Sequence, residues 1–146
     1  MLHPSDAEVQ EVCDKFPADY LQTDAEDFAS LNLPEGCRPL KVYRDLPGFD
    51  PSDIDPDVLS LFEGKNSGAG ELVNTSLAIE AANHAPIILA GGLNPKNVAS
   101  LLQAVQPQGV DVSSGVESDL GVKDVQKIRE FINIVRDYEW NREHEK

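Results

Sequence analysis

The chain has 146 residues, of which 12 are Lys or Arg and 26 are Asp or Glu, so its formal net charge at pH 7 is −14. Nucleic acids and anionic membranes are bound by basic surfaces, so this charge argues against both as partners. The chain contains no apolar run of about 18 residues that would span a membrane, and its first residues lack the pattern of a signal peptide. We therefore expect a cytoplasmic protein. The length and the 40% hydrophobic content favour a single domain over residues 1–146 with a real core.

The cysteines and histidines are few and scattered. Cys13 and Cys37 are too far apart in the sequence to predict a disulfide framework or a metal knuckle, so we expect reduced thiols. His3, His84 and His144 each stand alone, so we expect no metal site. Nothing in the sequence indicates a cofactor.

The first half of the chain alternates strand and helix signals. Ser5-Asp-Ala-Glu8 is a capping box and predicts a helix from about Asp6 to Lys15. Its apolar positions, which we expect to be buried, are Val9, Val12, Cys13 and Phe16. The segments that follow are predicted as a strand at 18–22, a short helix at 24–31, a strand at 39–44, a loop at 46–56 with a turn at 52–54, and a strand at 58–63.

The second half continues the alternation. Asn74 is a good N-cap and predicts a helix to about Asn83. Residues 86–117 then predict one β-α-β unit, in which Asn94 caps the helix. Its strands are placed at 87–90 and 110–112, and its helix buries Val98, Leu101, Leu102 and Val105.

A last helix is predicted from a cap at Asp124 to about Trp140, and residues 141–146 are expected to fray. Its apolar stripe is Val125, Ile128, Phe131, Ile132 and Val135. The chain thus shows five strands, each followed by a helix or a helical turn. This order predicts an α/β protein with a parallel sheet and right-handed crossovers.

Two small, polar turns follow the last two predicted strands. The first contains Gly91 and Gly92, and the second contains Ser113, Ser114 and Gly115. Parallel strands end at the same edge of a sheet, so the two turns are expected side by side. Exposed backbone N–H groups and two hydroxyls would suit a phosphate dianion. The alternative is that the glycines only permit tight turns. Two such turns on consecutive strands favour phosphate, because α/β barrels bind phosphate with the loops after strands 7 and 8.

These same segments resemble a known family. Residues 88–98 (ILAGGLNPKNV), 109–117 (GVDVSSGVE) and 121–124 (GVKD) closely resemble the C-terminal third of phosphoribosylanthranilate isomerase, and the resemblance extends from about Leu2 to Arg136. That family consists of (β/α)8 barrels of tryptophan biosynthesis. The resemblance implies an incomplete TIM barrel whose five strands correspond to strands 4–8, because 146 residues fall short of the roughly 200 to 250 that a barrel needs.

The resemblance also implies a reaction, the rearrangement of an aminoaldose phosphate to an aminoketose. By resemblance Glu63 stands at the position of the catalytic aspartate, which is the general acid. The phosphate cradle maps to Gly91, Gly92, Ser113, Ser114 and Gly115, and Asp111 is expected to contact a sugar hydroxyl. An aspartate inside an apolar strand is costly, which independently favours an inward, functional or paired role for Asp111.

Other positions depart from the family pattern. The family commonly has Gln-Leu-His-Gly where this chain has Gln22-Thr-Asp24-Ala, so Asp24 takes the histidine position. The mobile loop after Glu63 is represented by a segment with Gly68 and Gly70. The family's base is a cysteine after strand one, a region with no counterpart here, and neither Cys13 nor Cys37 is expected to replace it.

Arg44 ends the strand predicted at 39–44. It is placed to face an anionic substrate, and the alternative is an exposed or ion-paired arginine. Three functions follow from these observations. The first is an isomerase polypeptide that lacks its N-terminal units and is inactive alone, acting on a small phosphosugar. The second is a non-catalytic phosphate-binding or interaction module that associates through exposed sheet edges. The third is another phosphosugar isomerase or epimerase on the same barrel.

Overall fold

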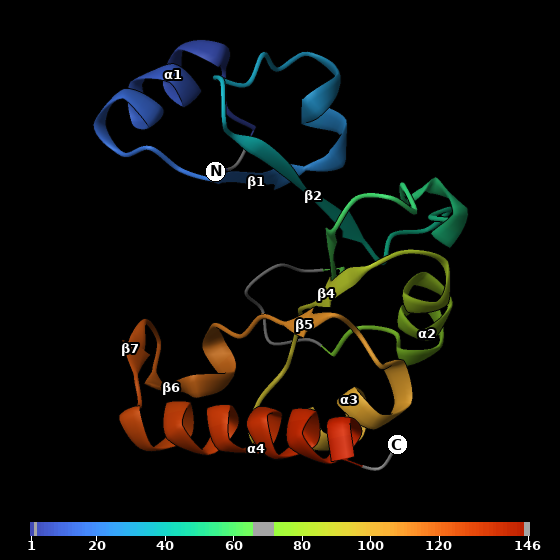
Figure 1. The fold of residues 1–146 in the computed structure, drawn as a ribbon. Helices are drawn as coiled ribbons and strands as arrows, with labels where there is room; N and C mark the ends of the chain where they lie inside the picture. The colour runs from blue at the N-terminus through green and yellow to red at the C-terminus, as the bar shows by residue number, and fades with distance from the viewer. Residues whose placement is uncertain (2, 66–71, 145–146) are drawn as a thin grey trace.

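A parallel sheet forms the centre of the molecule (Figure 1), and the computed structural model describes residues 1, 3–65 and 72–144. The sheet has five strands, all parallel and ordered as they occur in the chain, which confirms the predicted α/β architecture. The strands are β1 (Tyr20–Asp24), β2 (Arg38–Arg44), β3 (Ser60–Glu63), β4 (Ile87–Leu89) and β5 (Gly109–Val110). Because each strand lies beside the next one in the chain, the sheet has the topology of part of a (β/α)8 barrel.

Helices and helical turns connect the strands. The α-helices are α1 (Asp6–Lys15), α2 (Thr75–His84), α3 (Val98–Val105) and α4 (Val125–His144). The 3-10 turns are η1 (Ala25–Ala29), η2 (Pro51–Asp53) and η3 (Ser114–Val116). A two-stranded antiparallel hairpin, β6 (Glu117–Asp119) and β7 (Val122–Lys123), precedes α4 and was not predicted from the sequence. Among the described helices, none has both the length and the apolar character needed to cross a membrane.

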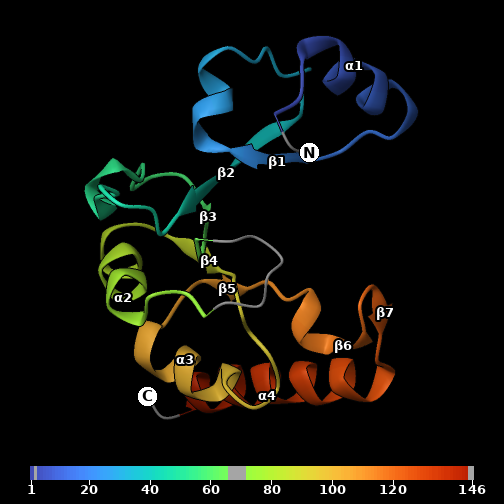
Figure 2. The same cartoon turned by 180° about the vertical axis from the view of Figure 1, so that it is seen from behind.

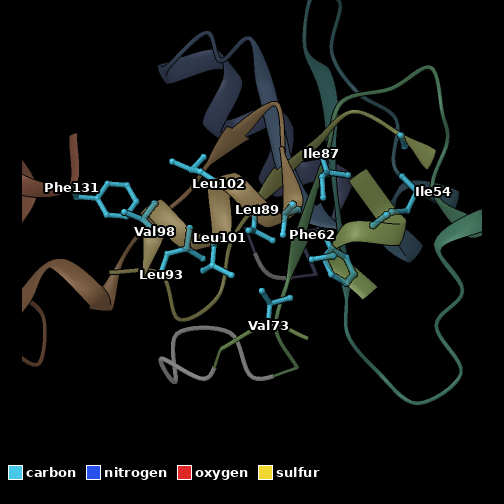
Figure 3. Close-up of a cluster of buried hydrophobic side chains, with 14 of the residues drawn as sticks. Ile54, Phe62, Val73, Ile87, Leu89, Leu93, Val98, Leu101, Leu102 and Phe131 are labelled. Atoms are coloured by element: carbon cyan, nitrogen blue, oxygen red, sulfur yellow. The ribbon is translucent and has the colours of Figure 1, made fainter. Parts of the chain in front are cut away.

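The main core lies between the sheet and the helices of the C-terminal half. Phe62 from β3 and Ile87 and Leu89 from β4 are fully buried in it. Figure 3 shows these side chains together with Val98 and Phe131, which come from α3 and α4. Burying side chains of this size contributes about 1.5–3 kcal/mol each. The β3-to-α4 portion therefore contains most of the packing that stabilises the fold.

The opposite face of the sheet carries a second, smaller apolar cluster. Val42, Leu61 and Ala90 are buried there, and Ile88 packs against them. Successive residues of a strand point to opposite faces, so Leu61 lies on this face and its neighbour Phe62 lies on the helix-covered face. In a closed barrel this second face is the barrel interior.

The helix α1 forms as predicted but buries less than predicted. Both hydrogen bonds of the Ser5–Glu8 capping box are present, and Val9 is buried. Val12 and Phe16 are 42% and 68% exposed, so their predicted burial is wrong. Figures 1 and 2 show the reason: α1 and β1 form one end of the molecule, away from α2, α3 and α4. At that end there is little structure for α1 to pack against.

Some element boundaries differ from the prediction. The helix α3 begins at Val98 with Asn97 as its N-cap, and Asn94 instead closes the preceding turn by accepting the Lys96 N–H (2.9 Å). Asp124 does cap α4, because its carboxylate accepts backbone N–H groups of Gln126 and Lys127 at 2.8 and 3.1 Å. The helix α4 continues to His144, beyond its predicted end at Trp140. Its stripe is only partly buried, since Val125 and Ile132 are exposed and Phe131 is buried.

Candidate active site

Three ionisable side chains mark the carboxyl ends of neighbouring strands. Asp24 ends β1, Arg44 ends β2 and Glu63 ends β3. In the ladder Asp24 pairs with Val42, and Arg44 pairs with Glu63. Alternation along the strands therefore places all three on the face that carries Val42 and Leu61, the interior face of a barrel. This rim is where α/β barrels build their active sites.

The guanidinium of Arg44 joins the two carboxylates. Its Nη1 pairs with Oε1 of Glu63. Its Nη2 and Nε donate to Oδ1 of Asp24 at 2.8 and 3.1 Å. The three side chains are only 11–20% exposed, so the charges are weakly screened. The structure therefore has the ion-paired arginine that the sequence left as an alternative. Anion binding by Arg44 stays a prediction, and it would require the guanidinium to exchange partners.

A histidine extends this group of charges. His3 lies in the segment before α1, and its Nε2 is 3.7 Å from Oδ2 of Asp24. Its Nδ1 is 3.0 Å from Oδ1 of Asp27, whose other oxygen accepts the Thr23 hydroxyl at 2.5 Å. The hydrogen bond between His3 and Asp27, followed by the negative charge of Asp27, raises the pKa of His3. The Thr23 hydroxyl and then His3 lower the pKa of Asp27. A sequence scan cannot find this contact, because 21 and 24 positions separate His3 from its partners.

Within the described part of the chain, His3, Asp24 and Asp27 are the group of ligand-type side chains close enough to consider for a metal ion. Both imidazole nitrogens face carboxylates, one to each. A coordinating imidazole gives one nitrogen to the metal, whereas an imidazolium donates from both. The arrangement therefore fits an ion pair, and the expected absence of a metal site stays a prediction.

The turn after β4 is tightly constrained. Gly91 and Gly92 have φ of 90° and 70°, a region that residues with a Cβ rarely adopt. A Cβ at Gly91 would lie 2.6 Å from the backbone nitrogen of Gly64, the residue after Glu63. The carbonyl of Gly92 accepts the side-chain amide of Asn97 at 2.9 Å. The first turn is thus packed against the end of β3 and held in place by α3.

The turn after β5 packs against the first turn. A Cβ at Gly115 would lie 1.8 Å from the carbonyl oxygen of Leu93, so the two backbones are in direct contact there. The prediction that the two turns lie side by side is confirmed. A cavity of about 420 Å³ borders this contact, lined by Asn94, Pro95, Lys96, Ser114, Gly115 and Glu117, among others.

Lys123 supports the second turn, a role that sequence reasoning missed. Its Nζ donates to the carbonyl and the hydroxyl of Ser113 at 2.9 and 3.2 Å, and pairs with Oε1 of Glu117 at 2.6 Å. The Lys123 ammonium and the Gly121 N–H hold the pKa of Glu117 below its usual value. The sequence signal for this role of Lys123 is the segment 121–124 (GVKD), which places a lysine shortly after the second turn.

Asp111 and the two glycines of the mobile loop are the remaining predicted site positions. Asp111 lies just beyond β5, its side chain is exposed, and its N–H donates to Leu89 at 2.9 Å. The premise that it is buried in an apolar strand is therefore wrong, although alternation places it on the same face as Ala90. Gly68 and Gly70 lie outside the described residues.

Comparison with known proteins identifies the family. The family model of N-(5'phosphoribosyl)anthranilate (PRA) isomerase matches residues 39–134. The isomerase of Chlorobium phaeovibrioides is 35% identical over 152 residues, an alignment that covers 92% of this chain and 70% of the relative.

The chain belongs to the N-(5'-phosphoribosyl)anthranilate isomerase family.

Other members of the isomerase family agree with this assignment. The isomerase of Acetivibrio thermocellus is 53% identical over 87 residues, which cover 58% of this chain and 39% of the relative. The crystal structure of the Thermus thermophilus isomerase superposes with a TM-score of 0.75 and 25% identity, over 93% of this chain and 70% of that one. The chain therefore spans at most about 70% of these relatives.

The described residues include both cysteines of the chain. Cys13 and Cys37 are free and partly buried, at the α1 end of the molecule. Burial, followed by the neighbouring Cys13 thiol, raises the pKa of Cys37. A raised pKa favours the neutral thiol. The expectation that neither cysteine replaces the base of the family stays a prediction.

Proposed function

We propose that this chain provides the phosphate site and the general acid of an N-(5'-phosphoribosyl)anthranilate isomerase. The substrate is a small phosphosugar, and the product is the carboxyphenylamino-deoxyribulose phosphate, an aldose–ketose rearrangement in tryptophan biosynthesis. The observation that carries the proposal is the backbone contact between the turns at Gly115 and Leu93. It brings the ends of β4 and β5 together at the rim where Glu63 ends β3. We place this reaction in the cytoplasm.

The phosphate grip is proposed at Gly91, Gly92, Ser113, Ser114 and Gly115. Among the described residues, the N–H groups of Gly92 and Ser114 donate to no other backbone group. Amides of this kind at consecutive left-handed glycines, with serine hydroxyls nearby, suit a dianion. Lys123 adds a positive charge beside Ser113. Held at this end, the substrate would extend across the rim toward Glu63, and Asp111 would meet a sugar hydroxyl.

Glu63 is proposed as the acid that protonates the ring oxygen as the sugar ring opens. An adjacent cation favours the carboxylate form of an acid, and Arg44 pairs with Glu63. Proton donation therefore requires that the guanidinium leave Glu63 when the substrate binds, which suits an arginine that takes up an anionic group. The second step, removal of the proton from the adjacent sugar carbon, needs a base that none of these residues provides. The chain alone is accordingly expected to bind substrate weakly and not to turn it over.

A chimera tests this proposal. The N-terminal units of the Chlorobium phaeovibrioides isomerase, joined to this chain in place of residues 1–2 so that His3 is kept, would supply the strand-one cysteine expected of the family. We expect the chimera to isomerise phosphoribosylanthranilate, and Glu63→Gln to lower its kcat by about 10²–10⁴-fold. The matched control, Glu80→Gln, changes an exposed glutamate on α2 and should leave kcat unchanged. A folded chimera without turnover, or an unaffected Glu63→Gln variant, would contradict the proposal.

A second function is favoured by the free edges of the sheet. In the described chain β1 and β5 each pair on one side only. Unpaired strand edges are templates for association. Self-association through these edges is the alternative, and sedimentation of the chain across a concentration series measures it directly. A stable dimer, together with a folded but inactive chimera, would favour an interaction module. Turnover of a plain pentose phosphate, without turnover of the anthranilate adduct, would favour another phosphosugar isomerase.

A further inference from the structure

We propose that Asp24 and His3 are positioning residues for Glu63, acting through Arg44. The proposal rests on the catalytic role proposed for Glu63, and it assigns a function to a position at which this chain departs from its family. The charges alternate from Asp27 through His3, Asp24 and Arg44 to Glu63.

The guanidinium of Arg44 is fixed from two sides. Its Nη1 faces Glu63, and its Nε and Nη2 face Asp24. The planar fork of an arginine can satisfy two carboxylates only in one orientation. Asp24 therefore determines where the charge of Arg44 lies relative to Glu63.

Asp24 is itself held through both oxygens. Oδ1 accepts the two N–H groups of Arg44, and Oδ2 faces Nε2 of His3 at 3.7 Å. His3 is held from its other side by Asp27, and Asp27 by Thr23. His3, Asp24 and Arg44 thus each have partners on two sides, an arrangement in which removal of one member loosens the next.

Two further acidic side chains line the cavity at this site. Glu26 and Asp53 border a cavity of about 540 Å³ together with Asp24 and Arg44. Arg44 donates to Asp24 from two of its nitrogens, and this contact keeps the guanidinium beside Glu63.

Asp24 stands where the resemblance places a histidine. In this structure an imidazole lies beside that position, supplied by His3 from another segment. The aspartate at position 24 supplies the carboxylate that holds Arg44.

NMR of the chain as it stands tests the positioning role. The Nε–H of Arg44 should give a slowly exchanging signal in the native chain. Asp24→Ala should speed its exchange about tenfold or more, and Asp24→Asn should largely restore it, because the amide oxygen still accepts from Arg44. Glu11→Ala breaks an exposed pair with Lys15 and is the matched control. Equal exchange in the native chain and in Asp24→Ala would overturn the proposal. If Asp24→Ala does not fold, rapid exchange of the native signal would overturn it by itself.

Two further measurements complete the test. His3→Gln should speed exchange of the Arg44 Nε–H, though less than Asp24→Ala does. Stoichiometric Zn²⁺ should leave the His3 and Asp27 signals in place, and a shift would overturn the ion-pair arrangement.

The same variants separate this proposal from the proposed function. If Asp24→Ala frees Arg44 but Glu63→Gln leaves the kcat of the chimera unchanged, Glu63 is not the acid and the proposed function fails, while the positioning of Arg44 stands. If Asp24→Ala leaves Arg44 fixed while Glu63→Gln abolishes turnover, the positioning role fails and the proposed function stands.

Discussion

Gly115 contacts the backbone of Leu93 so closely that a Cβ at Gly115 would lie 1.8 Å from the Leu93 carbonyl oxygen. The contact joins the turn after β5 to the turn after β4. Leu93 contributes main-chain atoms to this contact, and Gly115 permits it because glycine has no Cβ. Neither turn can move without displacing the other, which is the rigidity that a preformed anion site requires.

Gly115→Ala should therefore damage both turns. Backbone must shift to relieve the overlap, and overpacking of this kind costs about 1–3 kcal/mol. We expect a lower free energy of unfolding in urea and loss of phosphate binding. Gly109→Ala is the matched control, because its Cβ would come no closer than 3.7 Å to Ile88. Similar stability of the two variants would show that the close contact does not constrain the turns.

Lys123→Met should weaken phosphate binding and leave the fold intact. The ammonium fixes both the carbonyl and the hydroxyl of Ser113 and contributes charge beside the proposed cradle. We expect affinity for inorganic phosphate, measured by calorimetry, to fall by about fivefold or more. Lys15→Met removes an exposed charge on α1 and should have no effect. An unchanged affinity in Lys123→Met would place the anion elsewhere.

The Glu117–Lys123 pair predicts a pH dependence of stability. The pKa of Glu117 is lowered in the folded chain from its ordinary value of 4.5, by Lys123 and by the Gly121 N–H. A lowered pKa means that the carboxylate stabilises the fold above pH 4.5 and that this contribution is lost as the pH falls through the folded pKa. The free energy of unfolding of the native chain should exceed that of Glu117→Gln at pH 7, and the difference should close on acidification. A difference that widens at low pH would contradict the pairing.

Two phenylalanines test where the core lies. Phe62 is fully buried between the sheet and the helices, whereas Phe16 is 68% exposed on α1. Phe62→Ala should destabilise the chain by about 3–5 kcal/mol. Phe16→Ala should change the free energy of unfolding by less than about 0.5 kcal/mol. A large effect at Phe16 would mean that α1 packs against something beyond this chain.

The sequence predicted features that depend on neighbouring residues. The capping box at Ser5 and the N-cap at Asn74 were found because each is encoded within one segment. The order of the five strands was found because strands and helices alternate along the chain and because the chain resembles a barrel family. The two glycine turns were also found, since glycine at a strand end indicates the backbone conformation directly. The exposure of Phe16 was missed, because an apolar stripe predicts a buried face without showing what will cover it.

The ion pairs of the rim could not be predicted from the sequence, for a different reason. Arg44 lies 20 positions from Asp24 and 19 from Glu63, and no local pattern links them. They meet because β1, β2 and β3 pair in parallel with a particular register. A shift of one residue would turn Arg44 to the helix-covered face. Lys123 was missed for a related reason, since its contact with Ser113 depends on the β6–β7 hairpin.

Binding of an anion by the turns after β4 and β5 is measured most directly by amide NMR titration of the chain with ribose 5-phosphate. We expect saturable shifts centred on the amides of Gly91, Gly92, Ser114 and Gly115, with smaller shifts in an equal concentration of ribose. Equal shifts with ribose and ribose 5-phosphate, or shifts confined to residues away from these two turns, would contradict it.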